Sequence, residues 1–172
     1  MTVSGGEPLY QPRAVTALCK AAKEAGLHVA METCGFASET TVRTVAEWVD
    51  LFLFDYKATA DTHETLTGVP QKPILDTLAL LAELGKDVIL RCPIIPGCND
   101  TEEQFSDFVA LAKQYDNVKE VHLEPYHPLG ISKLEQLGRE VTYDNRSFLD
   151  AGSLTARCEQ MTGQCGKTVR VS

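Results

Sequence analysis

The sequence predicts an α/β fold, a partial TIM-like (β/α) barrel of about five to six parallel strands with helices outside. Short, mostly apolar runs rich in β-branched and aromatic residues alternate with amphipathic helical patterns. The connections between neighbouring runs are a dozen or more residues long, as parallel strands require. Polar residues end nearly every run, and this is typical of the active face of a barrel.

Six runs predict the strands, in chain order, at 1–3, 28–32, 51–55, 87–92, 118–124 and 167–171. Their carboxyl ends read Ser4-Gly5-Gly6-Glu7, Glu32-Thr33-Cys34-Gly35, Asp55-Tyr56-Lys57, Arg91-Cys92 and Glu124-Pro125-Tyr126-His127. A flavodoxin-like sheet would concentrate its site at one switch point, whereas these polar groups are spread over successive strands. We therefore predict a barrel, which is incomplete because it has fewer than the usual eight units.

Three helices are predicted from apolar residues at helical spacing. Their buried faces are expected to contain Val15, Leu18, Cys19, Ala22 and Ala25 in the first, Ile74, Leu78, Leu81 and Ala82 in the second, and Phe105, Phe108, Val109 and Ala112 in the third. Gly26 and Gly85 follow the first two as C-terminal caps. Asp100, with Glu103 three residues later, is the predicted N-cap of the third.

The composition predicts one domain that binds small molecules or protein. The chain has 172 residues, of which 44% are hydrophobic, and a net charge of −8. This charge argues against binding to nucleic acid or to an anionic membrane surface. No apolar run is long enough to span a bilayer and no signal peptide is present, so we expect a cytoplasmic protein whose six cysteines are free thiols.

The segment Ser4-Gly5-Gly6-Glu7-Pro8 is the strongest indication of a ligand site. Two glycines leave backbone N–H and C=O groups accessible, and Glu7 adds a carboxylate. Such a site suits a ligand with both an ammonium and a carboxylate group, such as the methionine end of S-adenosylmethionine. The alternative is a plain strand-to-helix turn with proline at the start of a helix.

Asp55 and Lys57 are the next candidates. Side chains two positions apart on a strand face the same way, so these two can share one ligand. A surface ion pair is the alternative, and it would contribute little stability. Arg91 points either into the barrel mouth or toward a helix, and strand alternation alone leaves both directions open.

In order along the chain, these motifs resemble those of the radical S-adenosylmethionine (radical SAM) activating enzymes of glycyl-radical enzymes, of the pyruvate formate-lyase type. The resemblance runs from residue 2 to about residue 139. It also includes Leu66-Thr67-Gly68-Val69, Ile95-Pro96-Gly97, Pro128-Leu129-Gly130, Ser132-Lys133-Leu134 and Leu137-Gly138.

The resemblance implies a fold, two cofactors and a reaction. The fold is a six-unit partial barrel of the radical SAM type, and three cysteines spaced C-x3-C-x2-C hold a 4Fe-4S cluster. S-adenosylmethionine binds the cluster and is cleaved to a 5′-deoxyadenosyl radical, which takes a hydrogen from a glycine of the partner, a glycyl-radical enzyme. A flavodoxin- or ferredoxin-type protein donates the electron.

The resemblance also implies roles for individual residues. The cofactor-binding positions are Gly5, Gly6, Glu7, Glu32, Asp55, Tyr56, Lys57, Arg91 and His127. Gly6 contacts the methionine amine and Glu7 supports it, while Asp55 and Lys57 bind the ribose and carboxylate and His127 lies near the adenosyl group. Glu32, Thr33 and Asp55 are a possible monovalent cation site, although the longer Glu32 side chain replaces the aspartate of the best-known member.

The six cysteines do not have the spacing of the cluster triad, and the chain begins where the second strand of the family barrel would begin. We therefore expect residues 1–172 to form a single truncated domain, the C-terminal part of an activating enzyme, without a cluster of its own and inactive alone. Its first strand, at 1–4, would be an exposed edge that favours association or fraying. Two alternatives remain: a cluster-free module that docks on a glycyl-radical enzyme, or an unrelated barrel aldolase or phosphate binder with Lys57 as a Schiff base.

Overall fold

The chain folds around one parallel sheet in which the six strands follow their order in the sequence, β1-β2-β3-β4-β5-β6. The structure is a computed structural model and describes residues 1–128, 136, 138 and 149–172. The strands are β1 (Thr2–Val3), β2 (Ala30–Thr33), β3 (Leu51–Asp55), β4 (Asp87–Ile94), β5 (Val118–Pro125) and β6 (Thr168–Val171). The sheet is not closed, so the prediction of a partial barrel with up to six strands is confirmed.

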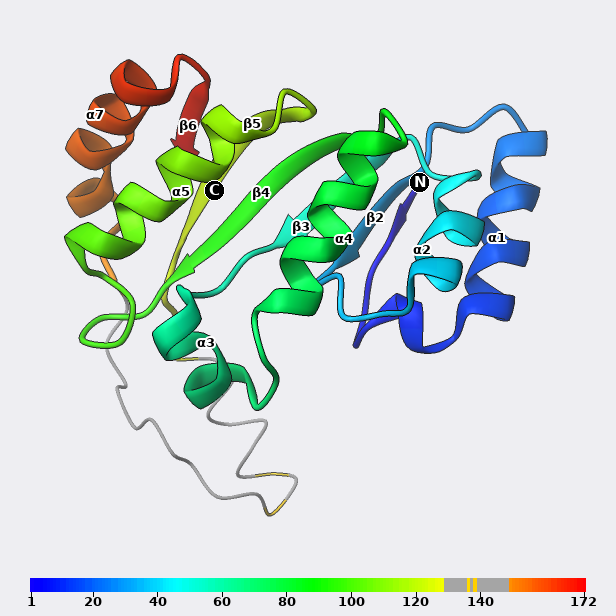
Figure 1. The fold of residues 1–172 in the computed structure, drawn as a ribbon, viewed down its shortest axis with the longest axis horizontal. Helices are drawn as coiled ribbons and strands as arrows, with labels where there is room; N and C mark the ends of the chain where they lie inside the picture. The colour runs from blue at the N-terminus through cyan, green and yellow to red at the C-terminus, as the bar shows by residue number, and fades with distance from the viewer. Residues whose placement is uncertain (129–135, 137, 139–148) are drawn as a thin grey trace.

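The helices lie together on one side of the sheet (Figure 1). They are α1 (Pro12–Glu24), α2 (Glu39–Ala46), α3 (Ala60–Thr67), α4 (Lys72–Glu83), α5 (Glu102–Gln114) and α7 (Thr155–Cys165), with 3₁₀ turns η1 (Pro8–Tyr10) and η2 (Ala151–Leu154). α1 contacts α2, α2 contacts α4, and α5 contacts α7. This one-sided cover explains the burial pattern of the strands.

Burial alternates along the central strands. In β3, Phe52 and Phe54 are buried under the helices, whereas Leu51, Leu53 and Asp55 are only half-buried on the opposite face. β4 alternates in the same way along its whole length. Burying one such phenylalanine contributes about 1.5 to 3 kcal/mol, so the helix-covered face supplies most of the core.

Three details differ from the sequence-based expectation, and one of them is Ala25, which is exposed and lies at the C-cap of α1. Leu18 lies on the solvent side of α1 with 50% of its surface exposed, because the buried stripe of this helix runs through Val15 and Cys19 instead. The N-cap of α5 is Thr101, whose hydroxyl accepts a hydrogen bond from the Gln104 amide, and the expected cap Asp100 is outside the helix. A hydroxyl at the position directly before the helix is the better-placed acceptor.

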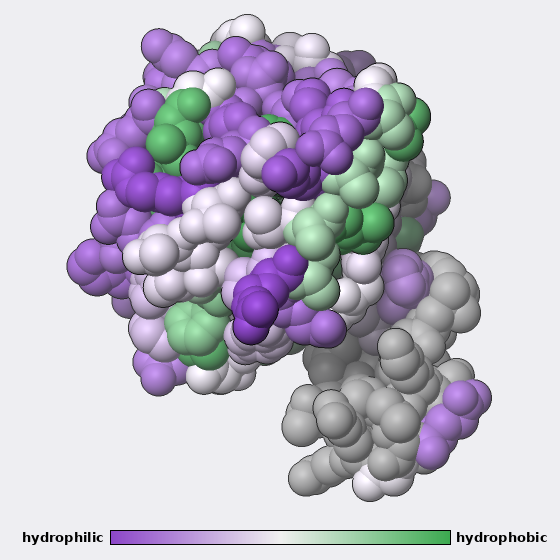
Figure 2. Space-filling view, turned by 90° about the vertical axis from the view of Figure 1, so that its right-hand side faces the viewer, coloured by the Kyte–Doolittle hydropathy of each residue, from purple (hydrophilic) through white to green (hydrophobic). Residues whose placement is uncertain are grey.

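β1 is an edge strand, as expected, and pairs only with β2 within the described part of the chain. Figure 2 shows the side that carries α1 and α2, where hydrophilic and intermediate residues cover most of the surface and hydrophobic ones form separate patches. Among the described residues, none of the helices has the length and apolar character that crossing a lipid bilayer would require.

Candidate functional site

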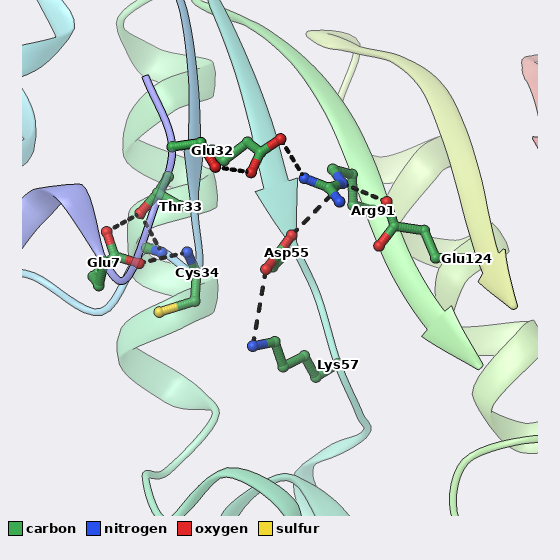
Figure 3. Close-up of polar contacts among 10 residues, drawn as sticks. Glu7, Glu32, Thr33, Cys34, Asp55, Lys57, Arg91 and Glu124 are labelled. Atoms are coloured by element: carbon green, nitrogen blue, oxygen red, sulfur yellow. Dashed lines mark hydrogen bonds and ion pairs between the residues drawn. The ribbon is translucent and has the colours of Figure 1, made fainter. Parts of the chain in front are cut away.

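The carboxyl ends of the parallel strands meet at one edge of the sheet, which we call the rim. Glu32, Asp55, Arg91 and Glu124 come from β2, β3, β4 and β5 and form one connected polar cluster there (Figure 3). Asp55 lies between Arg91 and Lys57 in this view. The structure thus brings together groups that lie far apart in the sequence.

The loop after β1 adopts the conformation that the two glycines permit. Gly5 and Gly6 have φ angles of 95° and 56°, in the left-handed region that other residues avoid, and their Cα atoms face open space. Backbone groups in this loop are therefore accessible to a ligand from the rim.

Glu7 fixes this loop to β2. Its carboxylate accepts hydrogen bonds from the Leu9 amide at 3.0 Å, the Thr33 hydroxyl at 2.7 Å and the Cys34 amide at 2.9 Å. Three protein donors thus occupy the group that the sequence analysis expected to support a ligand amine. In this structure Glu7 orients the glycine loop.

Replacing Glu7 with glutamine should lower the free energy of unfolding by about 1 to 2 kcal/mol, because an amide cannot accept from donors at both of its ends. We also expect faster amide hydrogen exchange at Cys34. Urea unfolding and exchange measured by NMR would check this, with Glu47→Gln on the exposed end of α2 as the control. Equal stability of the two variants would contradict the role of Glu7.

Arg91 points into the rim and not toward a helix, which settles the direction that the sequence left open. Its Nη1 lies 2.9 Å from a carboxylate oxygen of Glu32, and its Nε donates to Glu124 at 2.5 Å. The second oxygen of Glu32 accepts from the Ser4 hydroxyl at 2.5 Å. The guanidinium group of Arg91 on β4 therefore links Glu32 on β2 to Glu124 on β5.

Asp55 is the unusual member of the cluster. Burial raises the pKa of its carboxyl, while Lys57 and Arg91 act in the opposite direction. Its Oδ1 is buried and has no hydrogen-bond donor among the described residues, and Arg91 Nε is 3.9 Å from it. Lys57 Nζ lies 3.8 Å from Oδ2 and is partly exposed. An unsatisfied buried oxygen beside a partly exposed ammonium group favours a ligand that supplies a donor and a negative charge.

Asn99 holds the backbone of Lys57 by a hydrogen bond, and the sequence analysis did not identify this residue. Its side-chain nitrogen donates to the carbonyl oxygens of Lys57 and Pro93, both at 2.7 Å, and its oxygen accepts from the Ile95 amide at 2.6 Å. The available signal was an asparagine in the turn segment directly after a strand, since such residues often bond to nearby backbone groups.

Tyr56 does not join the cluster. It is fully buried on the helix side of the sheet, where its hydroxyl contacts Asp107 and Gln71 and its ring packs edge-on against Phe108. Because side chains alternate along a strand, the Tyr56 side chain lies on the opposite face of the sheet from those of Asp55 and Lys57. The expectation that its side chain contacts a cofactor is not supported.

The expected cation site is not assembled either. Thr33 is buried and its hydroxyl is bound to Glu7, while Glu32 points to the opposite face of β2 and pairs with Arg91. Within the described residues, no three histidine, cysteine, aspartate or glutamate side chains are grouped to hold a metal ion. Glu32 and Thr33 therefore have protein partners, whereas Oδ1 of Asp55 has no hydrogen-bond partner among the described residues.

His127 is exposed just beyond β5, on the rim side of the sheet. In the motif that supported its assignment, residues 124–128 are described and residues 129 and 130 are not; the later motif residues 132–134 and 137 also lie outside the described residues. All six cysteines are free thiols, and Cys34 lies beside Glu7 at the rim (Figure 3). Burial raises the pKa of its thiol to about 11, so it is not a reactive thiolate at neutral pH.

Comparisons with known proteins show the family and the fold of the chain. The family model described as "Radical SAM superfamily" matches residues 1–109. The chain is 38% identical over 158 residues to a choline trimethylamine-lyase activating enzyme of Oleidesulfovibrio alaskensis, a match that covers 90% of this chain and 51% of the relative. It is 33% identical over 157 residues to a 4-hydroxyphenylacetate decarboxylase activating enzyme of Clostridioides difficile, with 90% and 49% covered.

The chain therefore spans about half the length of the curated relatives it matches. Among solved structures, a domain of pyruvate-formate lyase-activating enzyme from Bacteroides vulgatus aligns with a TM-score of 0.80 at 24% identity, covering 100% of this chain and 98% of that domain. The comparison with this solved structure supports the fold alone. The family match covers more than half of the sequence, and the chain belongs to the radical SAM superfamily.

Proposed function

We propose that this chain is part of an activating enzyme that generates a glycyl radical on a partner enzyme. The relatives named above are activating enzymes, and the ordered rim motifs resemble those of the same group. The observation that carries the proposal is the buried, unsatisfied Oδ1 of Asp55 beside Lys57 and the open glycine loop. These groups fit S-adenosylmethionine, which has a ribose hydroxyl donor, a carboxylate and an ammonium group.

In this proposal each end of the cofactor has its own partner on the chain. Backbone groups of Gly5 and Gly6 bind the methionine amine, Lys57 binds the carboxylate, and Asp55 accepts a hydrogen bond from the ribose. His127 borders the adenosyl group. Together with a 4Fe-4S cluster, the bound cofactor supplies radical chemistry that removes a hydrogen atom. The six cysteines of this chain are not assigned to the cluster.

The half-buried face of the sheet lies next to these groups and has no described helix over it (Figure 1). We propose that the glycine-bearing loop of the partner approaches Asp55 and Lys57 from this side. The partner is a glycyl-radical enzyme of the pyruvate formate-lyase type, and choline trimethylamine-lyase is the first alternative because an activating enzyme of that name is a relative. A cytoplasmic location and a flavodoxin- or ferredoxin-type electron donor are part of the same proposal.

The test uses the full-length protein that contains this chain, reconstituted anaerobically with iron and sulfide. With a reductant, we expect S-adenosylmethionine to be cleaved to 5′-deoxyadenosine, and more of it when a glycyl-radical partner is added. Absence of cleavage by a protein with an intact cluster, checked by its absorption spectrum, would overturn the proposal.

In the same protein, Asp55→Ala should weaken S-adenosylmethionine binding at least tenfold. A hydrogen bond to a charged acceptor contributes about 1.5 to 3 kcal/mol, and each 1.4 kcal/mol is about tenfold in affinity. Equilibrium dialysis with labelled cofactor would measure the change. Asp61→Ala, at an exposed position in the first turn of α3, is the control and should bind as the wild type does.

A further inference from the structure

We propose that Glu124 is a positioning residue that holds Arg91 away from Asp55, so that the buried Oδ1 of Asp55 stays available to a ligand. The identity of that ligand rests on the function proposed above, whereas the positioning itself does not. Glu124 was expected at a strand end but was not assigned to the site.

The first step is the competition for the Arg91 guanidinium. Its Nε donates to Glu124 at 2.5 Å, and its Nη1 lies 2.9 Å from Glu32. Asp55 Oδ1 is 3.9 Å from the same Nε, which is too long for a hydrogen bond. The two glutamates therefore take the contacts that Asp55 would otherwise receive.

The second step is the state in which this leaves Asp55. Its Oδ1 is buried, yet no donor among the described residues reaches it. A buried carboxylate oxygen with a guanidinium nearby is expected to form a direct bond, because a buried acceptor without a donor loses its hydration and gains nothing in return. Figure 3 shows that Glu32 and Glu124 contact Arg91 from two sides, while its contact with Asp55 is the longer ion pair. In this proposal the two glutamates prevent the direct bond.

The third step concerns the charges around the carboxyl group. Lys57 and Arg91 face Asp55 with positive charge, and Glu32 and Glu124 face it with negative charge. If Glu124 loses its acceptor oxygens, Nε of Arg91 becomes free to move toward Asp55. The ligand site would then be closed by a hydrogen bond within the protein.

Two substitutions at Glu124 separate this effect from a simple change of charge. Glu124→Gln and Glu124→Leu both remove the negative charge, but only glutamine keeps an oxygen that accepts from Arg91 Nε. The loss of one negative charge near Asp55 is therefore the same in both variants. Only the leucine variant should release Arg91.

The pKa of Asp55, measured by carboxyl-carbon NMR on the ligand-free chain, should be lower in Glu124→Leu than in Glu124→Gln, because a hydrogen bond from Arg91 favours the charged carboxylate. The Nε–H resonance of Arg91 should shift only in the leucine variant, and its crystal structure should show Nε within hydrogen-bond distance of Oδ1. Equal pKa values in the two variants, or an unmoved Arg91 in the crystal structure of the leucine variant, would overturn the positioning role.

A second measurement uses the full-length, reconstituted protein. S-adenosylmethionine should bind about tenfold more weakly to Glu124→Leu than to Glu124→Gln, since the ligand must first displace Arg91. Equal affinities together with the expected NMR result would show that Arg91 is held but that the ligand does not use Oδ1. A wild-type protein that fails to bind the cofactor would count against the proposed function, while the NMR comparison would still decide the role of Glu124.

Discussion

Replacing Gly35 with alanine should destabilise the chain by about 3 to 4 kcal/mol, the largest effect of a methyl group added at any described glycine. The backbone at Gly35 has φ +75°, and an added Cβ would lie 2.6 Å from two ring carbons of Phe54 and 3.2 Å from the Thr77 methyl group. Phe54 is completely buried in β3 and cannot move aside without disturbing the core. Urea unfolding of the variant would measure the loss.

Gly26→Ala is the matched control for that experiment. Gly26 has nearly the same φ, +76°, but nothing lies within 4 Å of an added Cβ. It should cost about 1 kcal/mol from backbone strain alone. The difference between the two variants isolates the contact with Phe54, and equal losses would contradict the steric argument.

Asn99→Ala should cost about 3 kcal/mol, because it removes three hydrogen bonds and leaves the half-buried Ile95 amide without its acceptor. The side chain is 2% exposed, so water does not readily replace the lost partners. The effect should reach Lys57, whose carbonyl oxygen loses its donor, and cofactor binding should weaken with stability. Chemical unfolding and amide exchange at Ile95 would check the loss of stability, and equilibrium dialysis of labelled S-adenosylmethionine with the full-length protein would check the binding.

Asn117→Ala serves as its control. This asparagine is similarly buried but makes one side-chain hydrogen bond, from its nitrogen to the Lys86 carbonyl, and its oxygen has no partner within the described residues. We expect a loss of about 1 kcal/mol. A loss at Asn99 no greater than at Asn117 would mean that the turn after β4 does not depend on the asparagine bonds.

The strands and the location of the site were predictable because both depend on local patterns. Apolar runs separated by long connections predict parallel strands, and polar residues at their ends predict a shared rim. The direction of Arg91 was not predictable, because it depends on Glu32 and Glu124, which pair with it from strands distant in sequence. The prediction that Leu18 is buried was wrong for a related reason, since helical spacing does not state how wide the buried stripe of a helix is.

Residues whose role is to hold another residue were the hardest to find. The sequence shows Glu7 as a carboxylate beside two glycines, and only the fold reveals that Thr33 and Cys34 bind it. Asn99 and Glu124 likewise act through neighbours that come from other strands. A motif indicates which chemistry is present, but the partners of each group depend on tertiary contacts.

The one-sided cover of the sheet has a consequence for how the sequence can vary. Phe52 and Phe54 must fit a packed layer, so changes there are limited by volume. Leu53 and Asp55 lie on the same strand but face the opposite side of the sheet. Changes at these two positions are limited by charge and by the fit of a ligand instead of by volume. A saturation mutagenesis map of β3 and β4 should therefore alternate residue by residue between tolerance of polar substitutions and intolerance of any change in size.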